Sequence, residues 1–177
     1  MNDSWLLPGA SPDTQTVTAK WDPPDLRLID GVRVHEVRHV VKATGALTEL
    51  YRRDWFDDDR PVDQVFQVVI DPGSISAWHA HAETWDRLFV TQGSARIVLF
   101  DHRQGSPTFG LINEFRFGVL RPALVMVPPR VWHGVQCLGT EPAHVLNAVD
   151  RAYDYERPDH WRVERDCAAI PYRFPTP

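Results

Sequence analysis

The most informative stretch of the sequence is GSISAWHAHAETWDRLFVTQG, residues 73–93. His79 and His81 lie two positions apart, so on a β-strand both imidazoles point to the same face. Asp86 follows five residues after His81, beyond a short connection that would return the chain as the next strand. A carboxylate at that position would meet both rings from the neighbouring strand. The spacing therefore predicts two imidazoles and one carboxylate at a single point.

A third imidazole is expected from the segment VPPRVWH, residues 127–133. Its two prolines predict a sharp turn, after which His133 opens a new strand. The predicted ligands of a divalent transition metal are then His79, His81, Asp86 and His133, a set that suits Fe, Mn, Ni, Zn or Cu. Glu83 is the alternative acidic ligand. The other histidines, His160 among them, are predicted to be structural or exposed.

Segment 73–93 resembles the first motif of the cupin superfamily, with matching positions at Gly73, His79, His81 and Gly93. Asp86 stands where the usual motif has Glu. The second cupin motif is partly matched, by Pro128 and His133. It departs at Arg130, where Gly is usual, and at Cys137, where Asn is usual. This resemblance implies a small antiparallel β-barrel of the jelly-roll type, with a pocket at its mouth.

Short apolar runs separated by turn residues continue on both sides of this segment. The predicted strands are 32–41, 46–51, 64–70, 87–91, 95–100, 111–117, 123–127, 135–138 and 144–149. No stretch has a helical period of useful length. Many short strands at this spacing are typical of a sandwich or barrel, which predicts an all-β fold of the cupin type.

Three parts of the chain are expected from composition. Residues 1–25 are rich in Pro, Asp, Ser and Thr and predict an N-terminal arm. Residues 26–157 hold the predicted barrel. Residues 158–177 are polar with scattered aromatic anchors, and we expect this C-terminal tail to pack over the barrel.

Charge and apolar content exclude several classes of partner. The net charge is −5, from 19 basic and 24 acidic side chains, which disfavours nucleic-acid binding because phosphate contacts need clustered cations. No run approaches the ~18 apolar residues of a membrane span, and no signal peptide is evident. The two cysteines match no CxxC pattern and are expected to be free thiols. We therefore expect a cytoplasmic protein that acts on a small molecule.

A second family pattern is spread along the chain, in Ile29–Val32, Gly45–Phe56, Phe66-Gln67, Asp101–Gly110 and Val127–Gly134. Through these segments, from about Ile29 to Tyr155, the chain resembles the dTDP-4-dehydrorhamnose 3,5-epimerase family, which has a cupin-like (RmlC-like) barrel. The resemblance implies a nucleotide-linked keto sugar as substrate and His79 as catalytic base. It also implies Glu49 as a nucleotide contact, and a homodimer paired by strand exchange in the N-terminal region.

The same pattern is broken where that family does its chemistry. Ser76 and Thr44 stand where the resemblance calls for nucleotide-contacting Arg, and Asp86 falls where Lys is expected. Leu146 is aligned with the Tyr general acid. We also expect the segment that carries the Asp partner of the catalytic His to lie beyond Pro177. Because epimerisation next to a carbonyl needs both a base and an acid, these changes favour a metallocupin-like pocket.

Three functions follow from these observations. The first is a metal-dependent cupin enzyme acting on a small polar substrate, with a pocket walled by the aromatic residues Trp78, Trp85, Phe89 and Trp132; filling the core is the alternative role of each. The second is a metal-free epimerase or isomerase of a dTDP-4-keto sugar with His79 as base. The third is a non-catalytic ligand-binding cupin.

Overall fold

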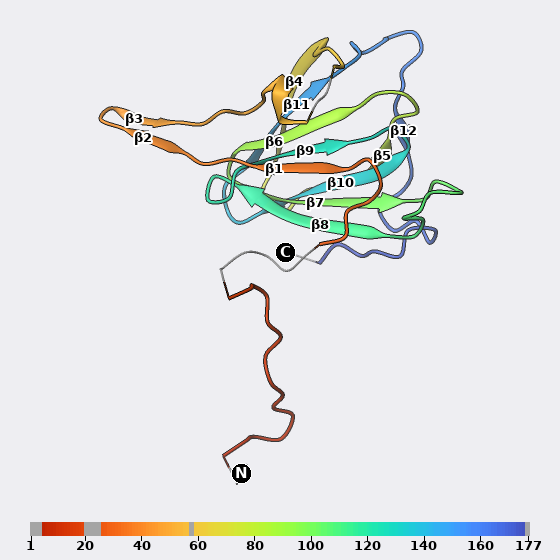
Figure 1. The fold of residues 1–177 in the computed structure, drawn as a ribbon. Coiled ribbons are helices and arrows are strands. Elements are labelled where there is room, and N and C mark those ends of the chain that lie inside the picture. Colours follow the sequence, from red (N-terminus) through yellow and green to blue (C-terminus); the bar gives the residue numbers. More distant parts are fainter. Residues whose placement is uncertain (1–4, 20–25, 57–58, 176–177) are drawn as a thin grey trace.

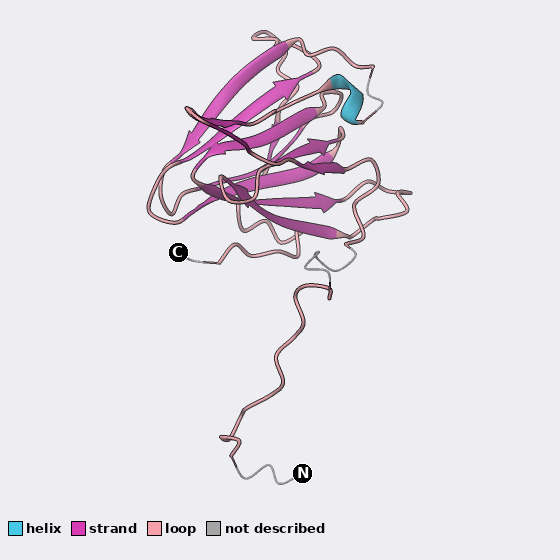
Figure 2. Cartoon of the chain, turned by 60° about the vertical axis from the view of Figure 1, so that its left-hand side comes forward, coloured by secondary structure: helices cyan, strands magenta, loops and turns pink. Residues whose placement is uncertain are grey.

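The computed structural model describes residues 5–19, 26–56 and 59–175, and almost all regular structure in these ranges is β (Figures 1 and 2). The strands are β1 (Arg33–Glu36), β2 (Val40–Lys42), β3 (Gly45–Leu47), β4 (Gln64–Ile70), β5 (Ile75–Ala80), β6 (Asp86–Gln92), β7 (Ser94–Asp101), β8 (Ile112–Gly118), β9 (Ala123–Val127), β10 (Val131–Leu138), β11 (Ala143–Val149) and β12 (Trp161–Arg162). In these ranges no helix is long and apolar enough to cross a membrane, since the 3-10 turn η1 (Arg53–Trp55) has three residues.

The strands form two five-stranded antiparallel sheets that face each other. One sheet has the order β1-β9-β6-β11-β4, and the other has the order β12-β5-β10-β7-β8. Strands β2 and β3 pair only with each other and project from the body as a separate hairpin (Figure 1). The arrangement confirms the predicted all-β jelly roll.

The core lies between the two sheets, where most inward-facing residues are apolar. Leu88 and Val90 of β6 face Ile97 and Leu99 of β7, and each of these side chains is at most 5% exposed. Each such side chain contributes roughly 1.5–3 kcal/mol by leaving water. This apolar packing closes part of the barrel and leaves the far end of the inner faces to polar groups.

The expected strand 32–41 is broken in two, because β1 pairs with β9 whereas β2 leaves the sheet to pair with β3. The expected strand 46–51 is reduced for the same reason to the three residues of β3. Both cysteines are free; Cys137 is buried and Cys167 is half-buried.

The two ends of the chain differ. Residues 5–19 form no helix or strand and are almost entirely exposed. The tail lies against the barrel: Ile170 is buried, and Tyr172 and Phe174 pack on Trp78 of β5. Strand β12, within this tail, extends the second sheet by pairing with β5.

Candidate functional site

A cavity of about 900 Å³ lies between the sheets at the mouth of the barrel. Apolar side chains of β4 and β11, including Phe66, Val68 and Val145, form one wall. The remaining wall is polar and comes from the ends of β5 and β6 and from residues 151–162. An apolar wall with a few convergent polar groups is the usual form of a small-molecule site.

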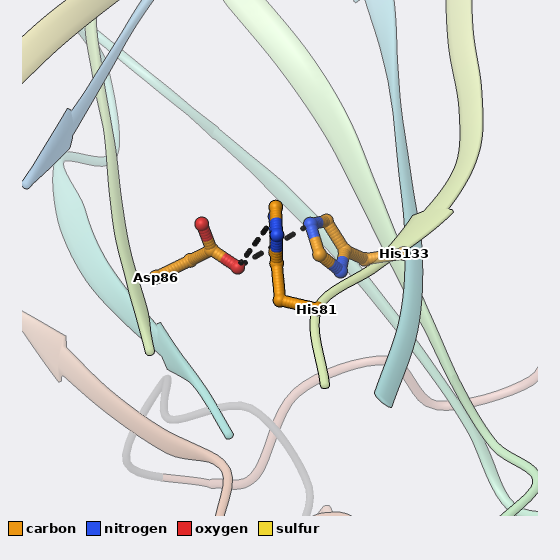
Figure 3. Close-up of side chains that lie close together, drawn as sticks. All are labelled: His81, Asp86 and His133. Carbon is orange, nitrogen blue, oxygen red and sulfur yellow. Dashed lines mark ion pairs between the residues drawn. The ribbon is translucent and has the colours of Figure 1, made fainter. Parts of the chain in front are cut away.

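Three predicted site residues converge beside this cavity (Figure 3): His81 and Asp86 line it, and His133 is buried next to them. His81 lies just after β5, His133 is on β10, and Asp86 is the first residue of β6. The Oδ2 atom of Asp86 is 3.5 Å from His81 Nε2 and 3.6 Å from His133 Nε2. The carboxylate comes from the opposite sheet, not from the strand beside the histidines as expected, because the chain crosses between sheets after β5.

Backbone carbonyls fix the tautomers of two of these rings. His81 Nδ1 donates its hydrogen to the carbonyl of Asp159, and His133 Nδ1 donates to the carbonyl of Val131 at 3.0 Å. A carbonyl only accepts, so in the neutral rings the Nε2 atoms carry lone pairs. His133 is 1% exposed, and its Nε2 has no hydrogen-bond partner within the described ranges.

Asn147 on β11 orients the carboxylate. Its Nδ2 donates to Asp86 Oδ1 at 2.7 Å, and its Oδ1 accepts from the backbone N–H of Arg87 at 3.0 Å. All three residues are buried. One oxygen of Asp86 is thereby held by an amide donor, while the other faces the two imidazoles.

Asp159 clamps the turn that carries His81. Its carboxylate accepts from the backbone N–H groups of Ala82, Glu83 and Thr84 at 2.6, 2.9 and 3.0 Å, and from the Thr84 hydroxyl at 2.9 Å. Burial raises the pKa of Asp159, but these donors outweigh it and lower the pKa to about 2. Glu83, the alternative acidic ligand, lies on the exposed side of this turn and pairs with Arg151 at 2.8 Å.

The proline turn before β10 supports the same region. Arg130 has a φ of 65° in the left-handed region and donates its N–H to the carbonyl of His81 at 2.6 Å. The cupin motif has Gly here, and Gly adopts this conformation without the ~1–2 kcal/mol cost of a Cβ. The departure noted in the sequence therefore leaves the turn in place.

Two further imidazoles line the cavity. The ring centroid of His79 is 4.1 Å from that of His133, and the ring of His160 is 5.3 Å from His79 and 5.1 Å from His81. Burial lowers the pKa of His79, His133 and His160, with neighbouring histidines and Arg162 acting in the same direction on His79. These three rings are therefore uncharged at neutral pH. His160, expected from the sequence to be structural or exposed, is half-buried and lines the cavity.

The predicted aromatic wall lies elsewhere. Trp78 and Trp132 pack in a second cluster between the β10 sheet and the tail, and Trp85 lies under the guanidinium of Arg60 at 3.8 Å. Phe89 is buried on the opposite face of β6 from Asp86 and Leu88, as the alternation of the strand requires. These side chains fill the core and the outer face instead of walling the cavity.

Glu49 is also outside the cavity of its own chain. It is exposed and pairs with Arg52 at 3.3 Å, in the segment that follows the β2–β3 hairpin.

Leu146 does not occupy the place of a general acid. Val145, Asn147 and Val149 of β11 line the cavity, so Leu146 belongs to the other face of the strand. The phenols that line the cavity are Tyr153 and Tyr155, which follow β11. Phenols are thus present at the cavity, although Leu146 itself lies outside it.

The family model of dTDP-4-dehydrorhamnose 3,5-epimerase matches residues 27–175. The chain belongs to this family. The match includes most of the C-terminal tail.

Two relatives match most of the chain. It is 31% identical over 139 residues to the probable low-salt glycan biosynthesis epimerase Agl13 of Haloferax volcanii, covering 78% of this chain and 89% of that protein. It is 30% identical over 152 residues to the spore coat polysaccharide biosynthesis protein SpsL of Bacillus subtilis, covering 84% and 98%.

A similar solved structure is the dTDP sugar isomerase of Desulfovibrio desulfuricans G20. It has a TM-score of 0.75 and 26% sequence identity, and the likeness covers 81% of this chain and 90% of that one. The family to which this chain belongs is therefore one of dTDP-sugar epimerases and isomerases.

Proposed function

We propose that this protein epimerises or isomerises a nucleotide-linked keto sugar, with a dTDP-linked 4-keto-6-deoxy sugar as the first candidate. The observation that carries the proposal is His79, an uncharged imidazole that lines the cavity at the position of the catalytic histidine in the family pattern. The metal-dependent cupin enzyme considered from the sequence becomes the less favoured function, because family membership supports the sugar reaction directly.

In the proposed reaction His79 removes a proton from the carbon next to the sugar carbonyl. An imidazole acts as a base only when it is neutral, which burial ensures for this ring. The enolate that forms must then receive a proton on the opposite face. Tyr153, which lines the cavity from the segment after β11, is the proposed donor.

Arg162 is the proposed contact for the diphosphate, in place of the arginine that Ser76 lacks. It is the register partner of His79 on β12, so both side chains point to one face, and both line the cavity. Arg151 and Arg157, also at the cavity, pair with Glu83 and Asp154. The Arg162 side chain makes no hydrogen bond or ion pair with other described residues, so its guanidinium is available to a phosphate.

A homodimer and a cytoplasmic location belong to the same proposal. The β2–β3 hairpin exposes Val40, Val41 and Leu47, at 54%, 83% and 43% of their surfaces. An apolar arm of this kind fits a second copy of the chain, in accord with the strand exchange that the family resemblance implies.

The test is conversion of dTDP-linked 4-keto-6-deoxy sugars by the purified chain, with the epimers separated by chromatography. We expect His79→Gln to lose product formation by at least about 100-fold while its Kd for dTDP stays within about twofold of wild type. Wild-type protein that binds neither dTDP nor other nucleoside diphosphates contradicts the proposal. Binding without turnover of any keto sugar favours the non-catalytic cupin instead.

A further inference from the structure

We propose that His81, Asp86 and His133 bind a divalent first-row transition-metal ion, leaving His79 outside the coordination sphere. Within the described ranges, the ligand atoms of these three residues all lie within 4.8 Å of one another, and His79 is not part of the group. The proposed ligand set has three residues, whereas the set expected from the sequence had four and included His79. It does not require that the sugar reaction be correct.

The electrostatics of the three groups require a cation between them. The carbonyls that hold both Nδ1 hydrogens leave both Nε2 lone pairs directed at the same carboxylate oxygen (Figure 3). Three acceptors facing one another repel unless a proton or a metal ion lies between them. The Nε2 of His133 is buried and has no hydrogen-bond partner among the described residues, so its lone pair is free to bind a metal ion.

The distances favour a metal ion over a proton. A hydrogen bond from a charged imidazole to a carboxylate spans about 2.7–2.9 Å. The observed Nε2–Oδ2 distances are 3.5 and 3.6 Å. Two ligands of a tetrahedral ion with bonds of 2.0–2.1 Å lie roughly 3.4 Å apart. The spacing therefore matches the edges of a coordination tetrahedron and exceeds that of an ion-paired hydrogen bond.

All three ligands already have the partners that metal ligands need. The carbonyls of Asp159 and Val131 fix the two imidazoles, and Asn147 holds the far oxygen of Asp86. Such outer contacts set the tautomer and orientation of ligands in metal proteins. Two imidazoles and one carboxylate leave further coordination positions open, and suit zinc or iron(II).

The ion would also restore a positive charge to the cavity. Asp86 stands where the epimerase pattern has Lys, and its carboxylate lies next to the imidazoles of His81 and His133. A bound divalent ion supplies Lewis-acid polarisation of a carbonyl or hydroxyl. His79, whose ring is 4.1 Å from His133, remains beside it as a base.

The test is metal binding by full-length protein that has been stripped with chelator and dialysed. We expect one equivalent of Zn²⁺ by calorimetry, and with Co²⁺ the absorption bands of a four- or five-coordinate ion. The variants His81→Ala, Asp86→Asn and His133→Ala should each weaken Zn²⁺ binding by at least about 10–100-fold. The exposed His102→Ala variant is the matched control for adventitious histidine binding and should stay within about twofold of wild type.

Asp86→Asn keeps the shape of the side chain and the hydrogen bond from Asn147, so it tests the ligand without removing a structural contact. Circular dichroism of each chelated variant establishes that it is folded. The proposal is overturned if wild-type protein takes up no stoichiometric Zn²⁺ or Co²⁺, or if the folded variants bind as well as the His102 control. A proton at this site would instead give a charged imidazole in the NMR spectrum with no metal uptake. None of these measurements uses a sugar nucleotide, so failure here leaves the proposed reaction untouched.

Discussion

Replacing Asn147 with Ala should destabilise the barrel mouth by about 3 kcal/mol. The substitution removes the 2.7 Å hydrogen bond to Asp86, of a charged type that contributes about 1.5–3 kcal/mol, although water in the cavity can replace part of it. It also leaves the buried N–H of Arg87 without its acceptor, which costs about 1–3 kcal/mol. Taking about 1.5 kcal/mol from each range gives the predicted value.

Urea unfolding in the presence of chelator measures this loss. With a slope of ~2 kcal/mol/M, the midpoint should fall by about 1.5 M urea at unchanged slope. The double mutant with Asp86→Asn should show a coupling energy of at least about 1 kcal/mol. His144→Ala, on the same strand but absent from the cavity lining, is the control and should change stability by less than about 0.5 kcal/mol. A midpoint for Asn147→Ala within about 0.25 M of wild type refutes the argument.

Three further predictions follow from single residues. The pKa of Asp159 is about 2, against an ordinary 3.8, so its contribution to folding stability is present above pH 4 and lost as the pH falls towards 2. Since the group is largely solvated, Asp159→Asn should lower the free energy of unfolding by only about 1 kcal/mol at pH 7, and should weaken the fall of the urea midpoint between pH 4 and pH 2. An unchanged fall of the midpoint contradicts the role of Asp159 as a clamp. Arg162→Ala should raise KM for the sugar nucleotide by about 10-fold or more with a smaller effect on kcat, and Arg162→Lys should restore part of the loss. Arg116→Ala, on the opposite edge strand β8, is the control and should leave KM unchanged. A KM of Arg162→Ala equal to that of the wild type would show that Arg162 does not contact the phosphate. Val41→Asp should convert the dimer to a monomer, as measured by light scattering. Leu120→Asp, at a side chain that is 98% exposed in the β8–β9 turn, is the control and should leave the dimer intact. A monomeric wild-type protein would contradict the proposed dimer.

The β-structure was predictable because strands with one buried face repeat every two residues. That periodicity also placed Asp86 and Leu88 on one face and the histidines at positions 79 and 81 within reach of His133. The same rule should have excluded Phe89 from the cavity, since it lies between two inward-facing residues.

The contributions of the tail could not be predicted from local pattern. Asp159 reaches the 81–84 turn across 75 to 78 positions of sequence, and His160 enters the cavity beside it. No periodicity links these residues to the β5–β6 turn, because the contact depends on how the tail packs over Trp78. The face on which Leu146 lies could not be predicted for a related reason, since the register of β11 is set by its pairing with β4 and β6.

The most direct test of the proposed chemistry is hydrogen exchange at the carbon beside the sugar carbonyl. A dTDP-linked 4-keto-6-deoxy sugar is incubated with the protein in D₂O, and deuterium uptake is followed by mass spectrometry and NMR. We predict uptake catalysed by wild-type protein and slowed at least about 100-fold in His79→Gln. Absence of uptake at substrate saturation, or equal uptake by the variant, would show that the histidine at position 79 is not the base.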